Sequence, residues 1–198
     1  MDITKIVDIL KKGGVVVIPT DTTYGIVCDA TNEEAVRKIY KLKGRDYHKP
    51  MIVLMNSIKM LEEYTSLVNP LERELINTYL PGELTIILNK NNLIPDIVTS
   101  GKDTLGIRIP NNKDLIDIIN KLGTPIVATS ANLSNQKEIT NINMLDNSIK
   151  SNVDYIYDIG YVNKGASTII KVDQNTINIL REGSLSGEIR KEYGDIVK

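Results

Sequence analysis

The cations with the spacing best suited to chemistry lie in the segment 37–50, where six Lys and Arg residues accompany a single acid. Three of the six fall within seven residues: Lys43, Arg45 and Lys49. Gly44 and Pro50 predict an irregular backbone there. A fork of Arg donors beside compact Lys charges suits an oligophosphate, although a solvated helix C-terminus would also favour cations.

Polar turns follow several apolar runs in this sequence. Two are rich in hydroxyl groups, 20–25 and 129–134, and Arg108 and Arg181 stand at the ends of two further runs. In open sheets covered by helices, ligands bind at the ends of strands, so we expect these side chains to meet at one site. Each also has an ordinary interpretation as a surface turn or a solvated charge, and their shared position is what favours a site.

The composition is that of an ordinary globular chain, and we expect one domain over residues 1–198. A net charge of −1 argues against a protein that coats nucleic acid, so an anionic ligand would need a local cationic cluster. The single Cys28 excludes an internal disulfide and a Cys-based zinc site. Without a recognisable signal peptide or an apolar run of transmembrane length, we expect a cytoplasmic protein with no membrane association.

Hydrophobic periodicity predicts strands alternating with helices early in the chain and local strand pairing later. Helices are expected at 4–12, 32–42, 57–64, 70–79, 114–122, 141–150 and 186–192, and 89–100 as a loop or short helix. Strands are expected at 15–18, 51–55, 84–88, 106–110, 126–128, 155–158, 167–172 and 176–180, with a short apolar run at 26–28. This order indicates an open, mixed, twisted sheet with helices on both faces.

Seven sequence blocks occur in an order that resembles a known family. They are Pro19-Thr20-Asp21-Thr22-Thr23-Tyr24-Gly25, Lys43-Gly44-Arg45 with Lys49-Pro50, Pro81-Gly82-Glu83-Leu84-Thr85, Gly106-Ile107-Arg108-Ile109-Pro110, Ser130-Ala131-Asn132-Leu133-Ser134, Ser167-Thr168-Ile169-Ile170 and Leu180-Arg181-Glu182-Gly183. Together they resemble the YrdC-domain family, the L-threonylcarbamoyladenylate synthases, over about residues 4–185.

The resemblance implies a three-layer α/β fold with a mixed, twisted sheet of about seven strands around a deep basic cavity. It implies condensation of L-threonine, bicarbonate and ATP to threonylcarbamoyl-AMP and pyrophosphate. Mg²⁺ would accompany ATP, with no metal ligands from protein side chains. A separate transferase would then modify tRNA with the threonylcarbamoyl group, and weak contact with RNA is compatible with this role.

The same resemblance implies roles for individual residues. Those expected to bind L-threonine are Thr22, Arg108 and Ser167. Those expected to bind ATP are Arg45, Lys49, Thr104, Ser130, Asn132 and Arg181, and the pair expected to act in catalysis is Lys43 and Arg45. Charge neutralisation and alignment matter more for this chemistry than a strong base, which agrees with a site rich in Lys, Arg, Ser and Thr.

His48 is expected to be an exposed loop residue. One position departs from the family pattern: Leu54 stands where some relatives carry a polar group near the threonine. Longer members of the family carry a second C-terminal domain, and one branch has no settled activity. Lys43, Arg45 and the Ser130-Ala131-Asn132 turn favour the synthase branch.

The alternative function is a module of the same fold that binds RNA in the basic cavity without catalysis.

Overall fold

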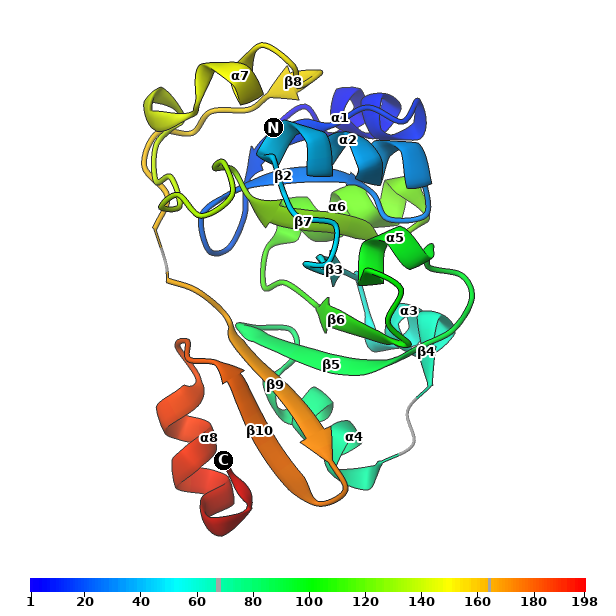
Figure 1. Ribbon diagram of the computed structural model, residues 1–198, viewed down its shortest axis with the longest axis vertical. Coiled ribbons are helices and arrows are strands. Elements are labelled where there is room, and N and C mark those ends of the chain that lie inside the picture. The colour runs from blue at the N-terminus through cyan, green and yellow to red at the C-terminus, as the bar shows by residue number, and fades with distance from the viewer. Residues whose placement is uncertain (67–68, 164) are drawn as a thin grey trace.

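The computed structural model describes residues 1–66, 69–163 and 165–198. Within them one mixed sheet contains ten strands: β1 Val16–Pro19, β2 Tyr24–Asp29, β3 Ile52–Leu54, β4 Thr65–Ser66, β5 Leu84–Lys90, β6 Thr104–Arg108, β7 Ile126–Ser130, β8 Tyr155–Ile156, β9 Thr168–Asp173 and β10 Thr176–Arg181. The strand order is β10-β9-β5-β6-β3-β7-β2-β1-β8, and β4 pairs with β5 (Figure 1). The pairs β1–β8, β3–β6 and β5–β9 are parallel, and the other pairs are antiparallel.

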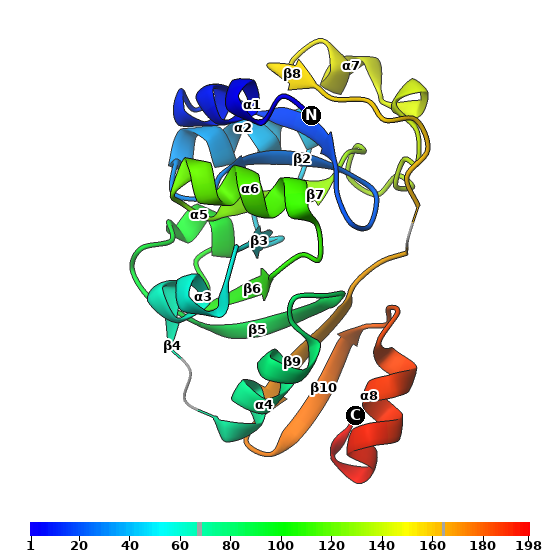
Figure 2. The same cartoon turned by 180° about the vertical axis from the view of Figure 1, so that it is seen from behind.

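Helices lie on both faces of this sheet. They are α1 Ile3–Lys11, α2 Glu33–Lys43, α3 Ile58–Tyr64, α4 Pro70–Tyr79, α5 Asp96–Thr99, α6 Lys113–Leu122, α7 Asn147–Lys150 and α8 Ser186–Tyr193, with 3₁₀ turns η1 Ile142–Met144 and η2 Gly194–Ile196. Helices α2 and α5 lie on the face toward the viewer in Figure 1. Helices α1, α3, α4 and α6 cover the other face, which Figure 2 shows from behind. No described helix has the length and apolar content needed to cross a bilayer.

Local sequence explains why α2 begins and ends where it does. The side chain of Asn32 caps its N-terminus by accepting from the backbone N–H of Ala35 at 3.1 Å, and acids occupy the first turn. Gly44 ends the helix in the left-handed region, at a φ of 55°. The basic loop therefore starts at a defined point, and its first cation, Lys43, is still part of the helix.

The two faces of the central strands differ in composition, and this difference locates the core. Alternate residues of β5, β6 and β9 point to the helix-covered face and are almost fully buried: Leu84, Ile86, Leu88, Leu105, Ile107 and Ile170. The intervening residues include polar side chains such as Thr85 and Arg108. The sheet thus has one aliphatic face against helices and one face available for a site.

The predicted α/β architecture is confirmed, and several details were wrong. The sheet has ten strands within the described residues, not the number of about seven that the resemblance implies. Strand β4 was not predicted, and β8, predicted at 155–158, is only two residues long. The predicted helix 141–150 is divided into η1 and α7, because Leu145 adopts an extended conformation between them. Strand β7 continues to Ser130, so the start of the predicted second polar turn is part of the sheet.

Candidate active site

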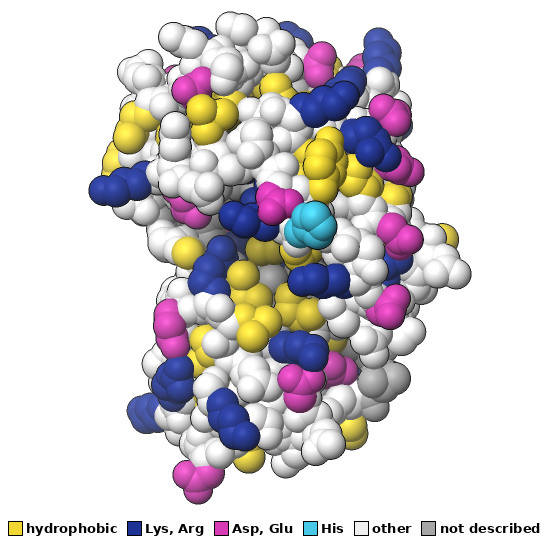
Figure 3. Space-filling model, in the orientation of Figure 1, with side chains coloured by type: hydrophobic (Ala, Val, Ile, Leu, Met, Phe, Trp, Pro, Cys, Tyr) yellow, Lys and Arg dark blue, Asp and Glu magenta, His cyan; other side chains and the backbone are white. Residues whose placement is uncertain are grey.

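A cavity of about 570 Å³ opens on the face of the sheet that is not covered by the larger group of helices. Its floor is a row of residues from neighbouring strands, aligned by the register of the sheet. Ile87 pairs with Lys171 on one side and with Gly106 on the other, and Ile52 pairs with Gly106 and Ala128. Figure 3 shows this face hollowed at mid-height, with Lys and Arg side chains gathered around the hollow. The site is therefore built on the face of the sheet, not only at the strand ends where we expected the ligand.

Charge in the cavity is predominantly positive. Five cations line it, namely Arg45, Lys102, Arg108, Lys171 and Arg181, together with two acids, Asp21 and Glu138. Hydroxyl groups supply most of the other polar lining: Thr20, Thr22, Thr23, Thr85, Thr104, Thr129, Ser130 and Ser167. A chain of nearly neutral net charge thus concentrates positive charge in one hollow, which suits an anionic ligand.

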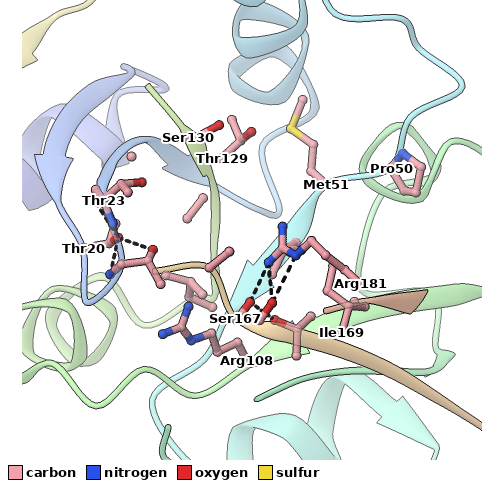
Figure 4. Close-up of a pocket in the computed structure, with 18 of the residues that line it drawn as sticks. Thr20, Thr23, Pro50, Met51, Arg108, Thr129, Ser130, Ser167, Ile169 and Arg181 are labelled. Atoms are coloured by element: carbon pink, nitrogen blue, oxygen red, sulfur yellow. Dashed lines mark hydrogen bonds between the residues drawn. The ribbon is translucent and has the colours of Figure 1, made fainter. Parts of the chain in front are cut away.

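Each of the three arginines that line the cavity is held by the protein along one edge of its guanidinium. Arg45 donates from Nε to the carbonyl of Lys49 at 3.1 Å and from Nη2 to the carbonyl of Pro50 at 2.8 Å. Arg181 donates from the same two nitrogens to the carbonyl of Ser167, at 3.1 and 2.9 Å (Figure 4). Burial lowers the pKa of both guanidinium groups, which nevertheless stay charged at neutral pH.

Arg108 is also held through Nε and Nη2, but one of its two partners is a carboxylate. Its Nε donates to the carbonyl of Gly82 at 2.9 Å, and its Nη2 donates to Oδ2 of Asp21 at 2.5 Å. The hydrogen bonds that Arg108 and Arg181 make with described residues use Nε and Nη2, and both side chains line the cavity. Cations fixed in this way need little reorganisation when an anion binds.

The packing of β9 and β10 places Arg181 beside Ser167. Nη2 of Arg181 also donates to Oγ of Ser167 at 2.8 Å, and that oxygen lies 2.9 Å from Oγ1 of Thr85. Gly183 permits this approach, since a Cβ there would lie 2.4 Å from the backbone nitrogen of Thr168. The glycine of the last sequence block is thus required for close backbone contact beside the site.

Lys43 does not line the cavity, although we predicted that it would act there. It is 2% exposed, and its ammonium donates to the carbonyls of Ser130 and, at 2.6 Å, Asn132. Its own carbonyl accepts from the backbone N–H of Ser134 at 2.9 Å. Burial, followed by the nearby charge of Arg45, lowers the pKa of Lys43 to about 8. Lys43 therefore joins the end of α2 to the turn after β7.

The other predicted site residues divide into those that line the cavity and those that do not. The structure brings together Thr22, Arg45, Thr104, Arg108, Ser130, Ser167 and Arg181 around the cavity, with Leu54 in its wall. Lys49 and Asn132 lie outside the lining. The exposed Lys49 donates to Oδ1 of Asn135 at 3.2 Å, while the amide of Asn132 is buried and donates to the carbonyls of Leu133 and Gln136. His48 is exposed, as expected, and contacts Asp46 at 2.9 Å.

The turn that follows β1 carries a cluster of hydroxyl groups at one side of the cavity. Oγ1 of Thr20 accepts from the backbone N–H groups of Thr22 and Thr23 and donates to the carbonyl of Thr23 at 2.6 Å. Oγ1 of Thr22 lies 2.9 Å from Oγ1 of Thr20. Figure 4 shows Thr20 and Thr23 on the side opposite Arg181, with Arg108 and Ser167 between. The hydroxyl cluster and the cations thus face one shared space.

Sequence reasoning missed four charged residues of the lining: Asp21, Lys102, Glu138 and Lys171. Asp21 stands inside a block that had already been identified, so its proximity to Thr22 was an available signal. The position of Lys171 was a second signal. It alternates with buried aliphatic residues in β9, so its side chain points to the opposite face of the sheet. Nothing in the local pattern around Lys102 or Glu138 indicates the cavity, because both lie outside the strands.

The geometry defines a class of protein, namely an α/β protein with a preorganised cationic and hydroxyl-lined cavity that suits a small anionic substrate. Among the residues the structure describes, no group of three or more His, Cys, Asp and Glu could hold a metal ion.

The family model Sua5/YciO/YrdC, described as telomere recombination, matches residues 8–183. The chain belongs to this family, which confirms the resemblance inferred from the seven blocks.

Individual relatives agree with this assignment. A Methanocaldococcus jannaschii protein provisionally named a threonylcarbamoyl-AMP synthase is 42% identical over 185 residues, covering 90% of this chain and 86% of its own. The threonylcarbamoyl-AMP synthase of Bacillus subtilis is 34% identical over 182 residues, covering 91% of this chain and 53% of its own. The chain thus spans about half the length of that relative.

A solved structure supports the fold directly. The crystal structure of Pyrococcus abyssi Sua5 complexed with L-threonine superposes with a TM-score of 0.91 at 30% identity, covering 99% of this chain and 58% of that one. The three-layer arrangement around a basic cavity, expected from the resemblance, is therefore confirmed.

Proposed function

We propose that this chain is an L-threonylcarbamoyladenylate synthase, which condenses L-threonine, bicarbonate and ATP to threonylcarbamoyl-AMP and pyrophosphate. The observation that carries the proposal is the division of one cavity into two electrostatic parts. Neither Arg45 nor Arg181 forms an ion pair with a described carboxylate, although the charge of Glu138 acts on Arg181, whereas Arg108 is paired with Asp21 beside the hydroxyl cluster. A polyanion fits the first part, and a net-neutral amino acid fits the second. Named synthase relatives and the threonine complex support the same assignment.

The roles of the individual residues follow from their positions. Arg108, Thr22 and Ser167 contact the amino acid, with Nη1 of Arg108 binding its carboxylate. Arg45, Arg181, Thr104 and Ser130 surround the nucleotide, and Arg45 neutralises charge on the phosphates during reaction. We propose different roles for the other predicted ligands. Lys49 meets the phosphates at the rim, whereas Lys43 and Asn132 act by holding the turn after β7 in place.

The reaction needs alignment more than strong acid–base catalysis. The threonine nitrogen attacks the carbon of bicarbonate, a C–N bond forms, and water leaves as the ammonium gives up two protons, one of them to solvent. An oxygen of the resulting carbamate then attacks the α-phosphorus, and the bond to the β-phosphate breaks to release pyrophosphate. Holding three substrates in one cavity and neutralising phosphate charge supply most of the acceleration.

Two further parts of the proposal concern what accompanies the substrates. Mg²⁺ arrives on the ATP phosphates, since magnesium is commonly held by phosphates, water and at most one or two carboxylates. The product is a reactive mixed anhydride of a carbamate and a phosphate, so a transferase that acts on tRNA must consume it promptly. The protein works in the cytoplasm beside that machinery.

Pyrophosphate release with ATP, bicarbonate and different amino acids tests the proposal. We expect activity with threonine, weaker activity with serine, and none with valine or 2-aminobutyrate, because a pocket that hydrogen-bonds the hydroxyl leaves its polar groups unpaired when the hydroxyl is absent. Arg108→Ala should raise the threonine requirement far more than the ATP requirement. No pyrophosphate release with threonine, combined with tight RNA binding at physiological salt, would instead support the RNA-binding module.

A further inference from the structure

Asp21 and Arg108 form a buried ion pair in the wall of the cavity. Their residues are 6% and 5% exposed, and Oδ2 of Asp21 lies 2.5 Å from Nη2 of Arg108. The same oxygen accepts from the backbone N–H of Asn111 at 3.2 Å. With Nε of Arg108 on the carbonyl of Gly82, the guanidinium is fixed by two partners on different segments. Its orientation in the cavity therefore depends on Asp21.

The pair is not arranged for stability alone. Oδ1 of Asp21 is buried and has no hydrogen-bond partner within the described residues. A buried carboxylate oxygen without a donor is unfavourable, and buried ion pairs often contribute less to stability than apolar side chains of the same size. A carboxylate at this place is better explained by what it does to Arg108.

The other anchored cations around the cavity differ from Arg108 in one respect. Lys43, Arg45 and Arg181 are held by backbone carbonyls, Arg181 also by a serine hydroxyl, and no described carboxylate forms an ion pair with any of them. At Arg108 a carboxylate is the second partner, and the local charge is balanced. A balanced pair suits a ligand that carries both charges and no net charge.

We infer that Asp21 is a specificity-determining residue for the amino-acid substrate, acting through Arg108. It holds the guanidinium through Nη2, which leaves Nη1 for a ligand, and it offsets the guanidinium charge. The balanced pair selects a zwitterionic α-amino acid against a simple carboxylate anion. This inference rests on the proposed function, because it assigns Arg108 to the substrate carboxylate.

Binding of two matched ligands tests the inference. Threonine is the zwitterion, and 3-hydroxybutanoate is the same molecule without the amino group, so it carries only the negative charge. Calorimetric titration of both ligands into wild type and Asp21→Asn gives a ratio of dissociation constants for each protein. We expect the substitution to weaken threonine and to shift the ratio toward 3-hydroxybutanoate by roughly tenfold or more, because one uncompensated positive charge is left in the site.

A matched control separates this effect from a general change of net charge. Asp117→Asn removes the same negative charge from an acid of α6 that is ion-paired with Lys113 and lies outside the cavity lining. We expect its ligand ratio to stay within about twofold of wild type, since screening weakens charge effects over distance. An equal shift in Asp117→Asn and Asp21→Asn would overturn the inference.

A double variant keeps the test decisive if Asp21→Asn alone does not fold. Neither Arg108→Gln nor the double variant Asp21→Asn/Arg108→Gln contains an unpaired guanidinium. The double variant should bind threonine with an affinity within about twofold of that of Arg108→Gln, because Asp21 has already lost its partner in both proteins. A large further loss would overturn the inference. So would an unchanged ratio in Asp21→Asn, or a wild type that binds neither ligand. A wild type that binds threonine but releases no pyrophosphate would refute only the proposed function.

Discussion

The buried ammonium of Lys43 makes the stability of the folded protein depend on pH in a defined direction. Its folded pKa is lowered to about 8, chiefly by burial. In the unfolded chain a lysine stays protonated to about pH 10.4. Between these two values the unfolded state binds one more proton than the folded state, so the free energy of unfolding rises with pH. At about 1.36 kcal/mol for each pH unit, the gain over this window is about 3 kcal/mol.

The substitution Lys43→Met isolates this contribution, because it keeps the length of the side chain and removes the titrating group. At pH 7 the variant loses the bonds to the carbonyls of Ser130 and Asn132 but is also relieved of a buried charge, so these effects oppose each other. The slope against pH is therefore the diagnostic quantity. Urea unfolding at intervals from pH 7 to pH 10.5 should show the wild-type stability, minus that of the variant, rising by about 3 kcal/mol.

Taking a difference removes the contribution of other groups that titrate in the same range. Burial raises the pKa of Tyr79 and Tyr193, which makes stability fall at the alkaline end in both proteins alike. Lys41→Met, on the exposed side of the same helix turn, controls for the change of net charge. A difference between wild type and Lys43→Met that is flat or falls with pH would refute the burial of a charged ammonium at this position.

Three further outcomes are expected. Arg45→Ala should weaken ATP use by about 1.5–3 kcal/mol with an unchanged melting temperature, since it removes a charge-assisted contact from the cavity; nucleotide affinity at the wild-type level would contradict the assignment. ATP affinity should fall as salt rises, while duplex RNA should not bind tightly at about 0.15 M salt. Tyr24→Phe should cost about 1–3 kcal/mol in urea unfolding, because the buried hydroxyl donates to Asp158 at 2.9 Å and accepts from Ile159, whereas Tyr47→Phe on the surface should cost less than about 0.5 kcal/mol.

Helix α2 shows how far the sequence could predict the fold. The Asn cap, the acids of the first turn and the glycine stop set its limits, and the structure places both ends within one residue of the predicted 32–42. The burial of Lys43 could also have been predicted. It follows Ile39 by four residues and thus lies on the apolar face of the helix, but its charge and its place in a basic segment favoured an exposed position.

The floor of the cavity could not have been predicted from any single strand. Gly106, Ile87 and Ala128 belong to three strands far apart in sequence, and only the register of the sheet brings them into one row. Register depends on pairing between distant strands, which local periodicity does not specify. The same limit applies to Asp21 and Arg108, which form a buried ion pair although 87 residues separate them.

In the proposed function, the distribution of charge, not its amount, lets a chain with a net charge of −1 bind a polyanion and an amino acid in one cavity. Backbone carbonyls orient Arg45 and Arg181 without cancelling their charges, so these side chains remain free to attract phosphates. A carboxylate orients Arg108 and offsets its charge, so we expect phosphates to gain less by binding there. If the three arginines carried equal uncompensated charge, ATP would compete with threonine for all of them. We therefore expect the carboxylate of Asp21 to keep the two proposed substrates in separate parts of the same cavity.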